Sequence, residues 1–325
     1  MYLLIMAGVL VLLSGAGAVR AQSSALRGGP AAHFPNKPIR WVTGGGPDAM
    51  ARVLGQKFTD AWGQQIVIEE RGGGGGMMSA DLVARATPDG YTLLLATGTH
   101  TISPNYFKMS YSMERDFAAV SLLGTITFIL SVHPSLPVKS VEELLALAKA
   151  KPGEINYTSG GTGSPAHIIT EYLRLKTGIN VIHVPYRTVG QAVTGLIGNQ
   201  AQFMFVVSPA SVPQVKAGRL RGLAVTALKR SPAVPDLPTM VEAGVADFEA
   251  LAWNGLMVPA KTPRDIINKL HAESAKSLKL PDVQERIAAL GFEAVGNTPQ
   301  AFAIFLKSEL DKWARVAKAT GAKAE

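Results

Sequence analysis

Short apolar runs alternate along this chain with stretches whose apolar residues recur at helical spacing. Residues 39–43 form the first run, and a glycine turn and then Asp48, a residue type common at helix N-caps, follow it. Apolar side chains recur at helical spacing over residues 50–58, and Gly63 marks a stop before a second run at residues 65–69. The pattern predicts a strand–loop–helix–strand unit, in which the unpaired N–H groups of the helix start can face an anion.

The same alternation continues to the C-terminus. Further strands are predicted at residues 91–96, 155–158, 181–184, 201–207, 222–226 and 250–258. Further helices are predicted at residues 77–86, 141–150, 165–177, 191–197, 240–243, 263–279, 281–290 and 298–319. The apolar run at residues 117–132 is long enough for two strands, or for one strand that crosses between domains. We therefore expect an α/β fold with mainly parallel sheets, in which ligands bind beyond the carboxyl ends of the strands.

Composition narrows the class of protein. With 325 residues, of which 47% are hydrophobic, the chain can bury a large core, and its length favours two domains over one. The formal net charge is +8, but Lys and Arg are scattered and aromatic residues make up only 7%, so we expect no nucleic-acid binding. The absence of cysteine excludes disulfides, a thiol nucleophile and a lipid-modified cysteine.

The N-terminus has the pattern of a secretory signal peptide. Residues 2–13 are almost wholly apolar, and small residues up to Ala21 follow them, which predicts cleavage after Ala21. The usual Lys or Arg before the apolar stretch is missing, so a misplaced start codon or a retained membrane anchor stay as alternatives. We expect residues 1–21 to be removed and the mature protein to be periplasmic.

The glycine turns admit three kinds of chemistry, of which the first is dinucleotide binding. Gly44, Gly46 and Ala49 imitate a dinucleotide fingerprint, and Glu69 or Glu70 lies about where a ribose-binding acid would lie. Export would separate the chain from its nicotinamide cofactor, and no His, Lys or Tyr stands out as a catalyst of hydride transfer. A cytoplasmic nicotinamide-dependent enzyme is therefore an alternative, and otherwise we expect no cofactor.

The second kind of chemistry is hydrolysis. Ser164 would be the nucleophile, but Thr162 stands where the nucleophile elbow requires glycine, so Ser164 is better interpreted as a helix cap before Pro165. The six histidines show no paired i, i+4 spacing and no acidic cluster beside them. We therefore expect no catalytic residue and no metal site, and interpret His167 as structural or pocket-lining.

The third kind of chemistry is anion binding without catalysis. Hydroxyl groups, glycine N–H groups and helix N-termini can hold a carboxylate with neutral donors, which avoids burying an unpaired cation. Hydroxyl side chains lie in the turns where such a site would form: Thr97, Thr99, Thr101, Ser159 and Thr162.

Several motifs together resemble those of a known family. They are PNKPIR at 35–40, GGPD at 45–48, TPDGYTLL at 87–94, SGGTGS at 159–164, HVPYR at 183–187, LRGLAVT at 220–226, PDLPT at 235–239 and WNGL at 253–256. On these residues the chain is similar to the Bug family, the TctC-type periplasmic solute-binding proteins of tripartite tricarboxylate transporters. The resemblance implies a two-domain periplasmic-binding-protein (Venus-flytrap, type 2) fold with a ligand cleft between the domains. It also implies a small carboxylate ligand, a membrane permease as partner, and no enzymatic activity.

The resemblance assigns domains and pocket residues. The expected division is a signal peptide at 1–21, domain 1 at 22–130 and 230–325, and domain 2 at 131–229. The implied pocket residues are Thr43, Gly44, Gly45, Asp48, Gly75, Thr97, Thr99 and Thr101 from domain 1, and Ser159, Gly161, Thr162, Gly163, Ser164, His167, Tyr186, Thr188, Gln191 and Ala192 from domain 2. Thr188 stands where the family usually has glycine, and the turn at Gly44 is a few residues shorter than in the family.

We thus expect a monomeric extracytoplasmic binder of a di- or tricarboxylate, an amino acid or an aromatic acid, which it delivers to a tripartite tricarboxylate transporter. Besides the nicotinamide-dependent enzyme, a ligand-sensing subunit of a signalling system is an alternative, because a receptor for transport and a receptor for signalling share the same sequence features.

Overall fold

The computed structural model describes residues 33–44, 48–72 and 76–321. Its strands are β1 (Ile39–Thr43), β2 (Ile66–Glu70), β3 (Thr92–Thr97), β4 (Phe117–Val132), β5 (Asn156–Ser159), β6 (Ile182–Pro185), β7 (Phe203–Val207), β8 (Arg221–Val225), β9 (Leu251–Pro259) and β10 (Glu293–Ala294). Its helices are α1 (Ala49–Trp62), α2 (Met77–Ala84), α3 (Thr99–Ile102), the 3-10 helix η3 (Ser103–Asn105), α4 (Val141–Ala150), α5 (Pro165–Thr177), α6 (Val189–Ile197), α7 (Ser208–Lys216), α8 (Arg264–Ser277), α9 (Pro281–Ala289) and α10 (Pro299–Thr320). The predicted signal peptide and the pocket candidates Gly45 and Gly75 lie outside the described residues.

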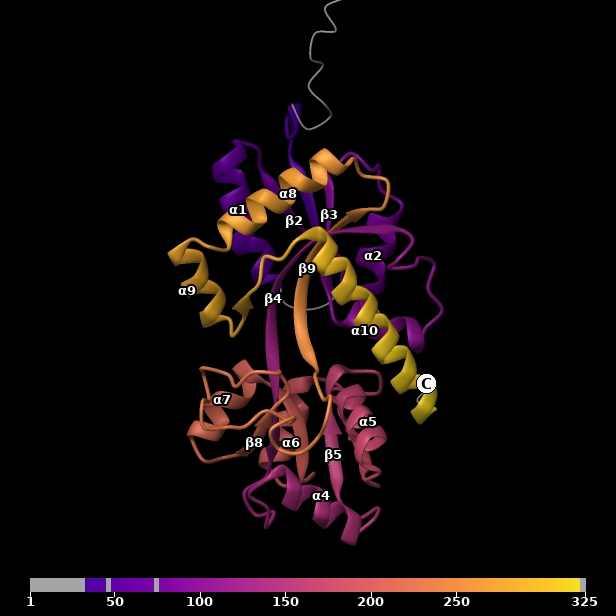
Figure 1. Ribbon diagram of the computed structural model, residues 1–325, viewed down its shortest axis with the longest axis vertical. Coiled ribbons are helices and arrows are strands. Elements are labelled where there is room, and N and C mark those ends of the chain that lie inside the picture. Colours follow the sequence, from indigo (N-terminus) through magenta and orange to yellow (C-terminus); the bar gives the residue numbers. More distant parts are fainter. Residues whose placement is uncertain (1–32, 45–47, 73–75, 322–325) are drawn as a thin grey trace, which may run out of the picture.

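The strands form one long mixed sheet whose two ends belong to different halves of the molecule (Figure 1). In the upper half of Figure 1, β1 pairs in parallel with β2 and β3, and β9 lies antiparallel between β3 and β4. In the lower half, β5 pairs in parallel with β6 and β7, while β4 pairs antiparallel with β7 and β8. Parallel pairs are present at both ends of the sheet, but antiparallel pairs join them, so the sheet is mixed and not mainly parallel as predicted.

The apolar run at residues 117–132 is a single strand, β4, that passes through both halves (Figure 1). Residues 117–127 pair with β9, and residues 128–132 pair with β7. The register shifts between Ala119 and Ser121 and between Leu122 and Gly124, which bends the strand before it enters the lower half. Of the two alternatives that the sequence left open, the crossing strand is correct.

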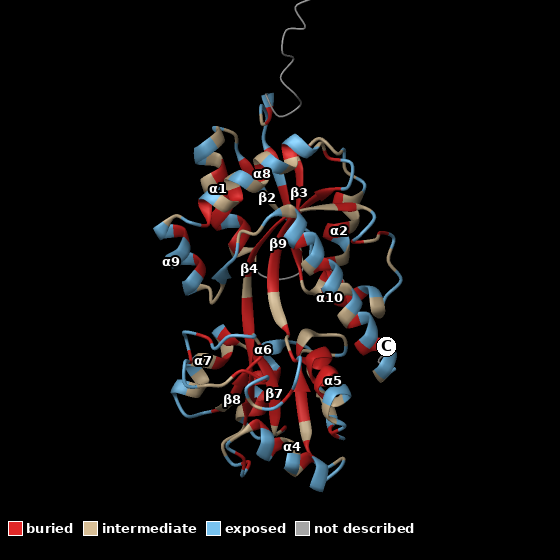
Figure 2. Cartoon of the chain, viewed as in Figure 1, coloured by how far each residue is buried: buried red, intermediate tan, exposed pale blue. Residues whose placement is uncertain are grey.

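Each half has a hydrophobic core of its own. Trp41 is fully buried in the core of the upper half, and Phe203 in that of the lower half. Figure 2 shows buried residues along the strands and exposed residues on the outer faces of the helices. Helix α10 joins the two halves, because Phe302 near its start packs in the upper half while Trp313 packs in the lower core. The buried apolar side chains of α10 therefore pack in the cores of both halves.

One predicted helix is absent from the structure, and some elements of the structure were not predicted. The expected helix at residues 240–243 is absent, and turns occupy this stretch; Thr239 N donates to Glu242 Oε2 at 2.7 Å and Glu242 N donates to Thr239 Oγ1 at 3.0 Å. These reciprocal side-chain bonds satisfy the backbone locally without a continued helix. Conversely, α3, α7 and β10 were not predicted; in α7, Pro213 inside the helix interrupts the helical pattern. The division between the two domains at residue 229 stays a prediction. Met240, which lies after that division in the sequence, packs in the core of the lower half.

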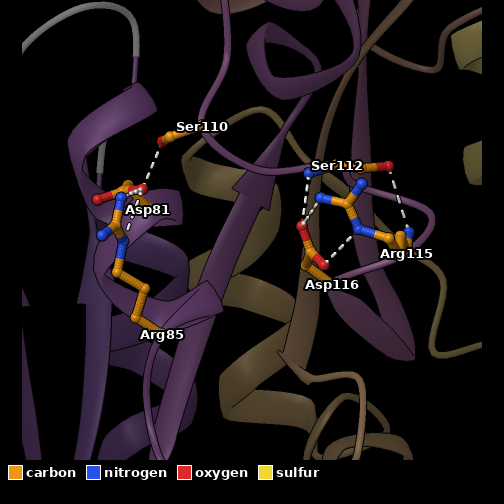
Figure 3. A network of polar contacts seen from close by, with 6 residues as sticks. All are labelled: Asp81, Arg85, Ser110, Ser112, Arg115 and Asp116. Carbon is orange, nitrogen blue, oxygen red and sulfur yellow. Dashed lines mark hydrogen bonds and ion pairs between the residues drawn. The ribbon is translucent and has the colours of Figure 1, made fainter.

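Charged side chains tie down the irregular loop between η3 and β4. Asp81 on α2 accepts hydrogen bonds from Ser110 Oγ and from Arg85 Nη2, the latter at 2.9 Å (Figure 3). Asp116 accepts from Ser112 N at 2.8 Å and from Arg115 Nη2 at 2.8 Å. These contacts lower the pKa of both carboxyl groups, so both stay ionised at neutral pH. Asp81 holds the loop at Ser110, and Asp116 holds it at Ser112.

Candidate functional site

A cleft of about 360 Å³ lies where β4 and β9 pass between the two halves. Its upper wall comes from the first residue of α1, the end of β3 and α3, and its lower wall from α5, the end of β7 and α7. The lining residues are mostly apolar: Ala49, Thr97, Gly98, Thr99, Ile102, Ile126, Phe128, Pro165, Ile169, Val207, Pro209, Ala210, Leu251, Ala252, Trp253, Asn254, Leu290, Phe292 and Trp313. Residues from both halves thus enclose one small space at their junction, as expected for a ligand site between domains.

Three helices of eight or more residues begin at this cleft. Ala49 is the first residue of α1, Pro165 is the first residue of α5, and Pro209 and Ala210 lie in the first turn of α7. The N–H groups of a helix's first turn have no partner within the helix, and the helix dipole adds a partial positive charge there. Pro165 and Pro209 have no N–H, so at α5 and α7 the free donors are the N–H groups of the other residues of the first turn. The cleft therefore offers positive potential without a cationic side chain, which suits an anion.

The loop at residues 159–164 follows β5 and leads into α5. Its first hydroxyl is occupied within the protein, because Ser159 Oγ accepts from Gly161 N at 3.1 Å and lies 2.7 Å from His183 Nε2. Gly161 and Gly163 adopt positive φ angles of 114° and 79°, which favour glycine. Ser159 thus shapes the loop, and the two glycines let it turn toward the start of α5.

Ser164 precedes α5, but its hydroxyl makes no capping bond, and its Oγ is buried without a partner. Ser164 therefore occupies the N-cap position, as predicted, but its side chain does not form the capping hydrogen bond. The extended backbone of Ser164, with ψ at 156°, turns the chain into the helix without a bond from the hydroxyl. Buried hydroxyls normally have a partner, so Ser164 Oγ is an exception among the described residues.

His167 and His183 stack on each other beneath this loop. Their ring centroids lie 4.3 Å apart, and the ring of Tyr157 lies 4.7 Å beyond His183. His167 Nδ1 accepts a hydrogen bond from Gly163 N at 3.0 Å. Burial lowers the pKa of His167, and burial together with the neighbouring His167 lowers that of His183 to about 4. Both imidazoles are neutral at pH 7, so they brace the loop and supply no charge to an anion.

The first strand ends next to the start of α1. Thr43 is fully buried and its Oγ1 has no partner, while its carbonyl accepts from Arg71 N at 2.8 Å. A Cβ on Gly44 would lie 2.2 Å from the carbonyl oxygen of Arg71, so only glycine fits there. Asp48 does not cap α1 with its side chain, because its carboxylate pairs with Arg52 at 2.6 Å.

The turn after β3 contributes two predicted residues to the cleft, Thr97 and Thr99. Thr101 does not reach it, because it is buried and its hydroxyl donates to Gly98 O at 2.8 Å. His100 fixes this turn: its Nδ1 accepts from Thr97 N at 3.0 Å, and its Nε2 donates to Gly76 O at 3.2 Å. The wall of the cleft is thereby connected to the start of α2.

The predicted residues beyond β6 lie elsewhere. Tyr186 and Gln191 line a separate hollow of about 800 Å³, together with Arg187. Thr188 caps α6 by accepting from Gln191 N at 3.2 Å, and Ala192 is fully buried in the adjoining core. None of these four side chains lines the cleft, and neither does the exposed Thr162.

Other residues of the cleft did not appear among the predicted site residues. Trp253 and Trp313 form part of its wall, and the indole N–H groups of both donate to Glu309 Oε2, at 3.3 and 3.0 Å. Asn254 Oδ1 is buried without a partner, while its Nδ2 donates to Trp253 O at 3.2 Å. A polar residue inside the otherwise apolar β9 was the signal in the sequence that could have indicated Asn254.

Metal and membrane chemistry find no support in the described parts of the chain. No group of three His, Asp or Glu residues that could hold a metal ion occurs among residues 33–44, 48–72 and 76–321. Within the same ranges, every helix is too short or too polar to cross a bilayer.

Known proteins share this architecture. The family model "Tripartite tricarboxylate transporter family receptor" (TctC) matches residues 50–322. The chain belongs to this family. BugT from Bordetella pertussis is 34% identical over 297 residues, covering 89% of this chain and 91% of that protein. Two similar solved structures are R. palustris Rpa4515 with adipate and the periplasmic binding protein BugD. They are 32% and 30% identical, with TM-scores of 0.76 and 0.73; each alignment covers 90% of this chain and all of the other.

These relatives confirm the predicted family and the two-domain periplasmic-binding-protein fold of this TctC-family chain. Members of the family are solute-binding proteins and not enzymes, which confirms that prediction as well. Small-molecule sites often lie at domain interfaces, and in this chain a cleft lies at the junction of the two halves.

Proposed function

We propose that this TctC-family protein is exported to the periplasm, where it binds a small carboxylate in the cleft between its halves and delivers it to a tripartite tricarboxylate transporter. The observation that carries the proposal is the meeting of the first turns of α1, α5 and α7 at the cleft. Their unpaired N–H groups and dipoles favour an anion. The similar protein Rpa4515 was solved with adipate, which is a carboxylate.

Three buried polar atoms near β1, β5 and β9 make no hydrogen bond in the described residues. Thr43 Oγ1, Ser164 Oγ and Asn254 Oδ1 are all buried without a partner. Thr43 precedes the turn to α1, Ser164 precedes α5, and Asn254 lines the cleft. Of these three, only Asn254 belongs to the lining of the cleft, and its Oδ1 can accept a hydrogen bond from a ligand that carries a donor group beside its carboxylate.

The test is thermal unfolding of the purified protein with a panel of small mono-, di- and tricarboxylates. A ligand at about 100 times its Kd stabilises the folded protein by about 2.7 kcal/mol, so the Tm rises. NAD serves as the comparison for the enzyme alternative. A panel that leaves the Tm unchanged while NAD raises it would contradict the proposal.

A pair of variants tests whether the ligand binds in the cleft. Thr99→Val removes a hydroxyl from the wall and keeps the shape of the side chain; we expect weaker binding of any acid that stabilises the wild type. Thr177→Val, at the far end of α5, is the matched control, and its affinity should equal that of the wild type. Equal affinities for both variants would remove Thr99 from the site.

A further inference from the structure

Asn254 is a polar residue inside the apolar strand β9, and it forms part of the wall of the cleft. Its side chain is 5% exposed. Its Nδ2 donates to Trp253 O at 3.2 Å, whereas its Oδ1 is buried and accepts no hydrogen bond from the described residues. A carbonyl oxygen can only accept, so the amide nitrogen faces Trp253 O and the amide oxygen is directed away from it. A buried acceptor without a partner costs free energy, which a donor on a ligand would remove.

Thr97 lies directly opposite Asn254 and also lines the cleft. The two residues pair in the antiparallel ladder between β3 and β9, so their side chains point to the same face of the sheet. The Oγ1 atom of Thr97 lies 3.2 Å from His100 Nδ1. Thr97 therefore places a second oxygen atom beside the amide oxygen of Asn254.

The protonation of His100 decides the role of the Thr97 hydroxyl. Burial lowers the pKa of His100 to about 4, so its ring carries one proton at pH 7. That proton is on Nε2, because Nε2 lies 3.2 Å from the carbonyl oxygen of Gly76, which can only accept. Nδ1 is then an acceptor for the Thr97 hydroxyl, and the hydroxyl oxygen is left to accept in turn. Asn254 and Thr97 thus form a pair of acceptors.

Both acceptors lie on the face of the sheet that α1 covers. Leu256 and Leu95, which lie two positions from Asn254 and from Thr97, pack in the same core as Met50 of α1. Side chains two positions apart on a strand share a face. The first residue of α1 also lines the cleft, and the N–H groups of its first turn have no partner within the helix. This wall of the cleft therefore offers donors and acceptors next to each other.

Building on the proposed function, we infer that Asn254 determines specificity in the cleft, and that the ligand is a carboxylic acid with a hydroxyl or ammonium group next to its carboxylate. The carboxylate accepts from N–H groups at the start of α1, and the neighbouring donor binds Asn254 Oδ1 and Thr97 Oγ1. An acid without that donor leaves the buried Oδ1 unsatisfied. A further carboxylate oxygen cannot replace the donor, because an ionised carboxylate only accepts. 2-Hydroxy acids and 2-amino acids have the required chemistry.

The test is isothermal titration of the purified protein with three series of acids that carry a hydrogen, a hydroxyl or an ammonium group beside the carboxylate. The series are propionate, lactate and alanine; succinate, malate and aspartate; and phenylpropionate, phenyllactate and phenylalanine. In at least one series we expect the hydroxy or the amino acid to bind roughly tenfold or more tightly than the unsubstituted acid. The two substituted members of that series show which donor the site takes.

Two outcomes of the titrations would overturn the inference. Unsubstituted acids that bind as tightly as their substituted partners in every series would do so and leave the proposed function standing. Binding of none of these acids would do so as well, and the thermal unfolding with the wider panel of carboxylates and NAD then decides the proposed function separately.

Asn254→Leu removes both polar atoms of the side chain at nearly constant shape. We expect the preferred acid to lose roughly tenfold in affinity, while the unsubstituted acid of its series changes little. Asn268→Leu is the matched control, because it makes the same change at an exposed position of α8 outside the cleft. A preference that survives Asn254→Leu in full, or one that Asn268→Leu abolishes as well, would overturn the inference.

Asn254→Asp distinguishes an acceptor from a donor at this position. The carboxylate of aspartate keeps an oxygen that accepts and has no N–H group. We expect this variant to keep more of the preference for the substituted acid than Asn254→Leu does, although its charge lowers the affinity for every acid. Equal preferences in the two variants would overturn the inference, and the wild-type series decide it if either variant fails to fold.

Discussion

The buried His100 makes the stability of this protein depend on pH in a way that a single substitution can isolate. His100 is 1% exposed, and burial lowers its pKa from 6.5 to about 4. Between these two values the unfolded chain binds a proton that the folded protein does not. The stability that comes from the neutral imidazole is therefore fully present above pH 6.5 and is lost as the pH falls toward 4. At about 1.4 kcal/mol per pH unit, the whole interval corresponds to about 3 kcal/mol, of which about 2 kcal/mol falls between pH 6.5 and 5.0.

The perturbation is His100→Gln, which can still accept from Thr97 N and donate to Gly76 O but does not titrate. We expect the variant to be less stable than the wild type at pH 7.5, and the difference to shrink by about 2 kcal/mol at pH 5.0. Because the other histidines are present in both proteins, their titration cancels in the difference.

Urea unfolding at pH 7.5, 6.5, 5.8 and 5.0 measures this difference. Circular dichroism and tryptophan fluorescence should be recorded together, since coincident transitions are required before a free energy of unfolding is extracted. A gap between wild type and variant that is the same at pH 7.5 and 5.0 would refute the reasoning. It would mean that His100 binds its proton equally in the folded and unfolded states.

Two further substitutions test the packing of the upper half. Gly255→Ala would put a Cβ 2.1 Å from Phe302 Cζ, so we expect the free energy of unfolding in urea to fall by about 1–3 kcal/mol. Gly190→Ala is the control, because a Cβ there would meet no atom within 4 Å; equal effects of the two substitutions would contradict the predicted clash. Glu309→Gln removes the carboxylate partner of the 14% exposed Lys312, which keeps its hydrogen bond to Glu249 O at 3.1 Å, and it weakens the bonds to both indoles. We expect a loss of about 1–3 kcal/mol with a change in tryptophan emission; wild-type stability would show that the pair is dispensable.

Sequence reasoning succeeded where a short stretch of chain determines its own structure. Gly63 ends α1 in the left-handed conformation, as predicted. Ser140, a residue type common at helix N-caps, accepts from Glu143 N at 3.1 Å at the start of the predicted helix α4. In each case the residue and the backbone group that it satisfies are within a few positions of each other. The path of β4 could not be decided in this way, because its pairing with β9 and β7 joins residues that are far apart in the sequence.

The difference between short-range and long-range contacts also explains why several predicted site residues do not line the cleft. The sequence indicated hydroxyl groups in turns, yet those of Ser159, Thr101 and Thr188 bond to groups of their own or neighbouring turns. A hydroxyl in a turn usually finds such a local partner, so its presence there is weak evidence for a ligand. The apolar wall, by contrast, brings together Phe128 and Trp313, which are distant in sequence and which periodicity alone assigns to a core. Helix starts and the apolar wall meet in the cleft only through long-range contacts, so the short-range patterns of the sequence could not bring them together.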